Sequence, residues 1–197
     1  MRSFLAGMTT LLAVAGLVAC GGGDDPTTST TSAPTAAPEP CGEIEEPTVE
    51  PGLHRDKDFK ADDYATNPPT SDDHNEEVLE AGAFYTDPPR LGEAVHLLEH
   101  GAVIGWTNDL SRADQKAVEE EFNEVFQDGY YQLAVVENPE LEVPFALSAW
   151  GAMQTCDEVD TSVIRPFVEE WYASPKSTEG PLACSGKARR LPPCKEL

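Results

Sequence analysis

Apolar residues at regular helical or strand spacing are concentrated between residues 92 and 173 of this chain. The preceding segment, 42–90, is interrupted by six prolines and carries many acidic residues. A chain with one patterned region can build one hydrophobic core, onto which the proline-rich segment must pack. The sequence therefore predicts a single globular domain over residues 41–175 with a loop-rich N-terminal part.

Helical and strand patterns alternate along the patterned region. The run EAVHLLEH is followed by the helix terminator Gly101, and Ser111 is a helix cap. Interleaved elements of this kind favour an α+β fold, with three helices on a small antiparallel or mixed sheet. The expected helices are 93–100, 111–129 and a stretch within 161–173, and the expected strands are 102–106, 130–136 and 143–150.

The charge balance excludes several classes of partner. Among 197 residues, 36 are acidic and 13 are basic, giving a net charge of −23. Such a chain repels phosphate backbones and anionic lipid headgroups, so a nucleic-acid partner and a polybasic membrane contact are both excluded. With 40% hydrophobic residues, the chain still has enough apolar side chains for a core.

The N-terminus has the features of a bacterial export signal. Arg2 precedes an uncharged, mostly apolar stretch that is too short for a good membrane span. The residues Leu17-Val18-Ala19-Cys20 resemble a lipobox, in which cleavage precedes a cysteine that carries lipid. We therefore expect a lipoprotein signal peptide at residues 1–19 and lipidation of Cys20; an ordinary secretory signal that ends in cysteine is the alternative.

The residues after Cys20 are typical of a tether. The stretch 24–40 consists mostly of Thr, Ser, Pro and Ala and has no aromatic residue, so it cannot bury enough apolar surface to offset its ordering entropy. Residues 20–40 are accordingly predicted to be a disordered linker. The membrane, reached through the lipid, is then the expected partner, and the bacterial cell envelope, outside the cytoplasm, the expected location.

Four further cysteines, Cys41, Cys156, Cys184 and Cys194, remain for the exported domain. An even number in an oxidising compartment indicates two disulfides, with three possible pairings. Cys184 and Cys194 bracket a Gly/Pro-rich tail within residues 176–197 that has little else to hold it. We favour a Cys184–Cys194 bond and a Cys41–Cys156 bond. Metal thiolates are the alternative, but no CxxC spacing supports them.

The chain has four histidines, and two of them share one helical face. His96 and His100 are spaced i, i+4, which places their rings close together. His74 and His54 lie in loops that can fold over this helix. Three or four neutral imidazoles suit zinc or copper. The alternative is that one histidine is a hydrogen-bonded core residue and the loop histidines are solvated.

The run His96-Leu97-Leu98-Glu99-His100 also matches HxxEH, in which a glutamate activates a zinc-bound water. Glu169 or Glu170 could then supply a distal carboxylate. Against this hypothesis, the expected helix ends immediately at Gly101, and the domain is small for a bilobed peptidase.

Several short motifs together resemble the domain-of-unknown-function family DUF3105 over roughly residues 50–173. The resemblance implies an exported or membrane-anchored protein, and it places all four histidines, His54 after Gly52 included, on motif positions. It carries no established reaction. Asp72-Asp73 and Ala152 depart from the family pattern, which has Gly-Pro and Arg there. The motifs are Tyr64 with Asn67-Pro68-Pro69-Thr70-Ser71 and His74, Gly82-Ala83-Phe84-Tyr85, Val95 through Val103, and Leu147-Ser148-Ala149-Trp150-Gly151.

The sequence thus favours a lipid-anchored extracytoplasmic domain that binds copper or zinc and has no catalytic residue. The first alternative is a non-catalytic interaction module of the cell envelope, with a structural histidine cluster and an unidentified protein partner. The second is a zinc metallohydrolase. The expected metal ligands are His54, His74, His96 and His100, and Glu99 is expected to accept a hydrogen bond from a ligand ring on the side away from the metal.

Overall fold

The computed structural model describes residues 39–179. The predictions for the signal peptide, Cys20, the linker, Cys184 and Cys194 fall outside these residues. The helices are α1 (Leu91–Glu99), α2 (Arg112–Gln127) and α3 (Ile164–Trp171), with short 3-10 turns η1 (Ala61–Asp63) and η2 (Thr161–Val163), and the strands are β1 (Ala83–Tyr85), β2 (Val103–Thr107), β3 (Leu133–Glu137), β4 (Phe145–Ala149) and β5 (Ala152–Cys156).

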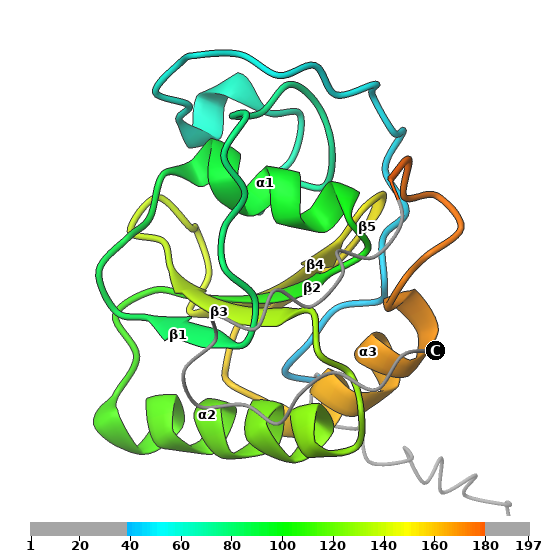
Figure 1. The fold of residues 1–197 in the computed structure, drawn as a ribbon. Coiled ribbons are helices and arrows are strands. Elements are labelled where there is room, and N and C mark those ends of the chain that lie inside the picture. The colour runs from blue at the N-terminus through cyan, green and yellow to red at the C-terminus, as the bar shows by residue number, and fades with distance from the viewer. Residues whose placement is uncertain (1–38, 180–197) are drawn as a thin grey trace, which may run out of the picture. The chain divides into compact units, whose positions relative to one another are not determined.

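The strands form one mixed sheet in the order β1-β3-β2-β4-β5 (Figure 1). Strands β1, β3 and β2 are parallel, whereas β4 and β5 continue the sheet in antiparallel pairing. The predicted α+β class, with three helices on a small sheet, is confirmed. Each of the three predicted strands overlaps one observed strand, β2, β3 or β4, and the predicted ends of the first two fall one residue short. Strands β1 and β5 were not predicted.

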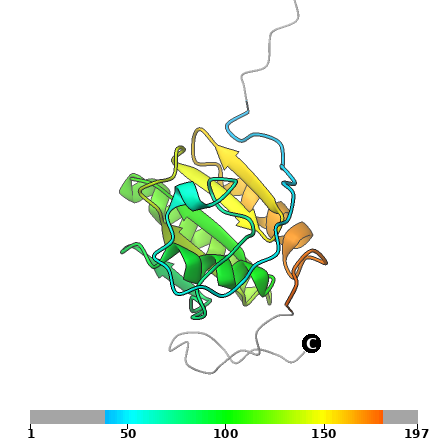
Figure 2. The same ribbon diagram turned by 90° about the horizontal axis from the view of Figure 1, so that it is seen from above.

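Both faces of the sheet are covered. Helices α2 and α3 pack below it, and α1 packs above it together with the covering segment, which we define as residues 45–82 (Figures 1 and 2). Along β2, Val103 contributes to the core under α2 and α3, whereas Ile104 and Trp106 contribute to the core under α1. A central strand with both faces buried is apolar throughout, which explains the continuous run from Val103 to Trp106.

The helix ends follow local sequence signals. The Ser111 hydroxyl accepts a hydrogen bond from the Asp114 backbone N–H at 3.2 Å and so caps α2. Helix α1 ends at Glu99, two residues before Gly101, whose φ of +81° favours glycine. A Cβ at Gly101 would also lie 2.9 Å from the Ala173 backbone, so glycine brings the end of α1 against the chain after α3.

The two unpredicted strands lie at opposite edges of the sheet. Strand β1 has three residues in the proline-rich segment, too few to show alternation. Strand β5 includes the half-exposed polar pair Gln154 and Thr155, which weakens its apolar pattern. Among the described residues, no helix is both long enough and apolar enough to cross a bilayer.

The first described residues of the chain are joined to the edge strand β5. Cys41 and Cys156 form a disulfide, which is the pairing favoured from the sequence, and they also face each other in an isolated β-bridge. Glu45 and Met153 exchange two backbone hydrogen bonds at 2.8 and 2.9 Å. The covering segment therefore begins at a fixed point on the sheet.

We expect Gly105→Ala to lower the free energy of unfolding by about 1–3 kcal/mol, because overfilling a packed core forces side chains and backbone to shift. A Cβ at Gly105 in β2 would lie 2.6 Å from Phe122 Cζ in α2. Urea denaturation measures the change. Glu124→Ala, at an exposed position of α2, is the control and should change stability little. Equal stability of Gly105→Ala and the wild type would contradict this packing.

Replacing both Cys41 and Cys156 with Ser should cost about 2–5 kcal/mol of unfolding free energy, since the bond closes a long loop in the unfolded chain. The two cysteines are 115 positions apart. Thermal unfolding with and without reductant measures the effect. Reductant should lower the melting temperature of the wild type more than that of the double variant; an equal response would show that this bond does not form.

Candidate metal site

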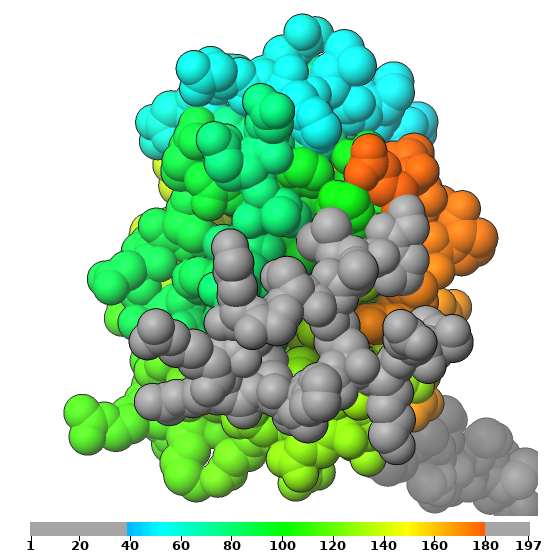
Figure 3. All heavy atoms as spheres, viewed as in Figure 1, coloured from blue at the N-terminus to red at the C-terminus, as the bar shows by residue number. Residues whose placement is uncertain are grey.

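Helix α1 supplies three polar side chains to one site. His96, Glu99 and His100 follow the i, i+3, i+4 spacing and lie on one helical face. All three are largely buried, because the covering segment and the residues after α3 pack over this part of the helix. Figure 3 shows the covering segment in cyan above α1 and the chain near residue 179 in orange beside it.

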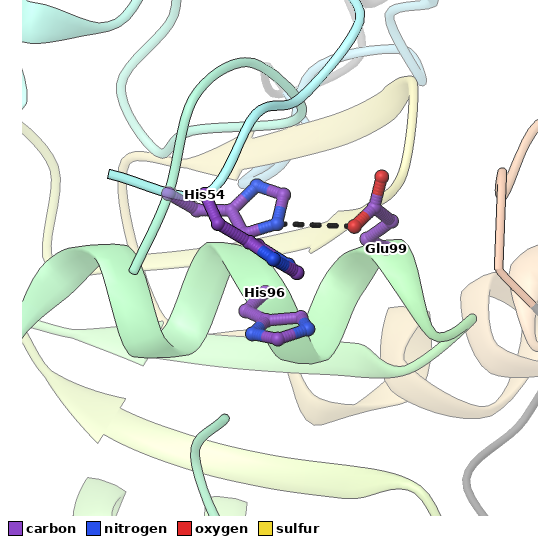
Figure 4. A group of neighbouring side chains, drawn as sticks. His54, His96 and Glu99 are labelled. Atoms are coloured by element: carbon purple, nitrogen blue, oxygen red, sulfur yellow. Dashed lines mark ion pairs between the residues drawn. The ribbon is translucent and has the colours of Figure 1, made fainter. Parts of the chain in front are cut away.

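The covering segment supplies His54 and His74. These two residues form an isolated parallel bridge, in which the Arg55 N–H donates to His74 O at 2.7 Å and the His74 N–H donates to Leu53 O at 3.1 Å. A Cβ at Gly52 would lie 2.6 Å from His74 Cε1, so glycine at this position leaves room for the His74 ring. Figure 4 shows His54 above His96, with the dashed line marking the His74–Glu99 ion pair.

The structure brings His54, His74 and His96 together in one group, whereas His100 lies beside His96 in a second group. Ring centroids lie 4.7 Å apart for His54–His96, 4.8 Å for His74–His96, 5.0 Å for His54–His74 and 5.0 Å for His96–His100. Potential ligand atoms of His54, His74, His96 and Glu99 all lie within 4.8 Å of one another. We call these four residues the inner set.

Backbone carbonyls orient two of the rings. His74 Nδ1 lies 2.9 Å from Asp72 O, and His96 Nδ1 lies 3.3 Å from Glu77 O. A carbonyl only accepts hydrogen bonds, so each Nδ1 must carry the proton. In the neutral ring the lone pair is then on Nε2, which is the usual arrangement of a metal-binding histidine.

The Nε2 atoms of these rings face a carboxylate in one case and another imidazole in the other. His74 Nε2 lies 3.0 Å from Glu99 Oε2, and among the described residues it has no hydrogen-bond partner of suitable alignment. His96 Nε2 lies 3.2 Å from His100 Nε2. Two lone pairs at such distances repel unless a proton or a cation lies between them. At metal–nitrogen distances of about 2.0–2.1 Å, two ligands of a tetrahedral ion lie about 3.3–3.4 Å apart, close to the observed separations.

Burial controls the protonation of the central ring. The exposed fractions are 0% for His74, 5% for His96 and 6% for Glu99, whereas His54 is exposed. Burial lowers the pKa of His96, and the nearby rings of His74, His100 and His54 lower it further. His96 is therefore neutral at neutral pH, which is the form that binds a metal.

Glu99 lies beside Nε2 of His74, the ring atom that is available to a metal, and not beside Nδ1 on the other side of the ring. Its Oε2 faces His74 Nε2, while its Oε1 accepts a hydrogen bond from the Thr178 hydroxyl at 2.5 Å. The position behind the ring, where we expected Glu99 from the sequence, is taken by the Asp72 carbonyl. The carboxylate is thus oriented as a direct donor to the cluster.

A second group of donors lies beside the first. Glu179 Oε2 lies 3.2 Å from His100 Nε2, and the ligand atoms of His96, His100 and Glu179 all lie within 4.8 Å of one another. We call these three residues the outer set. Thr178 and Glu179 follow α3 in an irregular stretch without periodicity, so no sequence signal pointed to them.

Asp72 and Asp73, which stand where the family pattern has Gly-Pro, position the backbone around His54 and His74. The Asp73 carboxylate accepts hydrogen bonds from the Leu53 N–H at 3.0 Å and from Arg55 Nε at 2.9 Å. The hydrogen bond from Arg55 holds the pKa of Asp73 below its usual range. Asp72 has a φ of +102° and presents its carbonyl to His74.

Glu169 and Glu170 lie on α3, which packs on the opposite face of the sheet from α1.

These observations define a mixed-sheet α+β domain with a histidine–carboxylate cluster between one helix and its covering segment. Residues 56–186 match the family model described as a protein of unknown function (DUF3105), and the chain belongs to this family. The matched range includes His74, His96, Glu99 and His100 but begins two residues after His54. Comparison with curated proteins and with solved structures gives no match.

The ring orientations can be tested without any metal. We expect Nδ1 of both His74 and His96 to be protonated at pH 8, because each faces a backbone carbonyl. Long-range ¹⁵N–¹H correlation spectra of the side chains, assigned with His74→Gln and His96→Gln, report the protonated nitrogen of each ring. An unprotonated Nδ1 in either ring would contradict the geometry described above.

Proposed function

We propose that this domain binds one transition-metal ion through the inner set, His54, His74, His96 and Glu99. The observation that supports this most strongly is the pair of facing acceptors, His74 Nε2 and Glu99 Oε2, which lie 3.0 Å apart in a buried position. A bound cation removes the repulsion between them and satisfies both atoms at once.

The donor types favour particular ions. Three imidazoles and one carboxylate suit zinc or copper(II), whereas copper(I) prefers thiolate and thioether sulfur. In the described part of the chain, Cys41 and Cys156 are joined in a disulfide and offer no thiolate. Zinc and copper(II) are therefore the ions that we propose.

We also propose that the domain is held at the outer side of a bacterial membrane by lipid on Cys20. The lipobox-like sequence before Cys20 and the Thr/Ser/Pro-rich stretch after it support this location. The Cys41–Cys156 bond is consistent with an oxidising compartment.

A hydrolase is the weaker alternative. In an HxxEH enzyme the glutamate must be available to activate a metal-bound water. Here one oxygen of Glu99 accepts a hydrogen bond from Thr178 and the other faces His74. The distal carboxylates considered from the sequence, Glu169 and Glu170, lie on the helix that packs across the sheet. The arrangement favours binding over catalysis.

A structural cluster in an interaction module is the other alternative. In that case a proton, and not a metal ion, lies between His74 and Glu99, and the buried pair only stabilises the covering segment. Metal-binding measurements separate the two hypotheses directly.

The full chain, exported into an oxidising compartment, should bind one zinc or copper(II) ion per molecule by elemental mass spectrometry. We expect His74→Gln/His96→Gln to weaken binding by more than about 100-fold, since loss of even an outer-shell partner of a metal ligand costs about 10–100-fold. Competition with a chromophoric chelator measures the affinity.

Because all four histidines lie in the cluster, the control is Glu170→Gln, an exposed carboxylate on α3. It also replaces an ionisable side chain with glutamine, but on the other face of the sheet, and it should bind as the wild type does. A wild-type chain that takes up neither ion would leave the histidine cluster as a structural feature only.

A further inference from the structure

The inner and outer sets share one residue, His96. The inner set contains His54, His74 and Glu99 in addition, and the outer set contains His100 and Glu179 in addition. Next to His96 along the chain, the inner set uses Glu99 and the outer set uses His100. We infer that they are two alternative positions of a single metal ion, which moves between them while it remains bound to His96. This inference rests on the proposed metal binding.

The chemistry of His96 limits the inner and outer sets together to one ion. Its Nδ1 faces the Glu77 carbonyl at 3.3 Å and carries the proton, so only Nε2 has a lone pair to offer. Bridging two ions through one neutral imidazole would require both ring nitrogens. An ion in the outer position and an ion in the inner position therefore exclude each other.

The short distances make movement between the positions feasible. His100 Nε2 lies 3.2 Å from His96 Nε2, and the ring centroids of His74 and His96 are 4.8 Å apart. An ion can exchange His74 and Glu99 for His100 and Glu179 one ligand at a time. At no point does it leave His96 or become fully hydrated.

The outer set is more exposed to solvent than the buried residues of the inner set, which suits it to the entry and release of the ion. The Glu179 side chain is 49% exposed, whereas His74 is fully buried and Glu99 nearly so. A solvent-exposed carboxylate is a suitable first contact for an incoming ion. The outer set is thus the position through which an ion enters and leaves, and the inner set is the position that retains it.

His54 offers a competing route, because it is the exposed member of the inner set. Substitutions distinguish the two routes by their opposite effects on the rate of metal release. Removal of an ordinary ligand weakens binding mainly through faster release. Removal of the residues of an exchange route slows release, because the ion must then leave the inner set directly.

The test uses the full chain loaded with one equivalent of zinc and mixed with excess 4-(2-pyridylazo)resorcinol, whose absorbance reports zinc transfer. We expect His100→Gln/Glu179→Gln to slow transfer about tenfold, comparable to the smaller effects of removing groups around a metal site. His54→Gln should speed transfer. Glu170→Gln, which removes one exposed charge from α3, should transfer at the wild-type rate.

Three results would overturn the inference. The first is faster or unchanged transfer in His100→Gln/Glu179→Gln. The second is two zinc ions per wild-type chain with the second lost in this variant, which would show independent sites. The third is the absence of zinc binding by the wild type, which would remove the proposed function as well. One zinc ion per chain with unchanged transfer would leave the proposed function in place and exclude only the exchange route.

Discussion

The burial of helix α1 on two sides is the constraint on which the site depends. The sheet packs against its apolar residues, and the covering segment packs over the face that carries His96 and Glu99. Polar groups that are buried in this way must find partners, since an unpaired buried donor or acceptor costs about 1–3 kcal/mol. The partners come from segments distant in sequence: His74 from the covering segment and Thr178 from the chain after α3.

The covering segment has almost no regular secondary structure, so side chains hold it in place. Asp73 joins the backbone around His54 to that around His74, and Asn75 Nδ2 donates to two carbonyls of the same segment. Gly52 and Gly92 permit close contacts with His74 and Asn75 that a Cβ would prevent. Asp73 and Asp72 stand where Gly-Pro was expected, and they orient His74 without joining the donor sets.

Much of the fold follows from the sequence, because α1 and α2 have apolar residues at helical spacing and the three inner strands are continuous apolar runs. Strands β1 and β5 do not, since one is very short and the other is a partly exposed edge. The i, i+4 spacing predicted that His96 and His100 would lie together. No local pattern predicts that Glu99 faces Nε2 of His74 or that Glu179 lies beside His100. Both contacts depend on the path of irregular segments in the folded chain.

We propose that His74 Nε2 and Glu99 Oε2, which face each other at 3.0 Å, bind the same metal ion. Crystals of the full chain grown with zinc, with diffraction data collected on both sides of the zinc absorption edge, test it most directly. The account predicts an anomalous peak bonded to Nε2 of His74 and of His96 and to the Glu99 carboxylate, at about 2.0–2.2 Å. Ordered rings of His74 and His96 with no anomalous peak between them would contradict it.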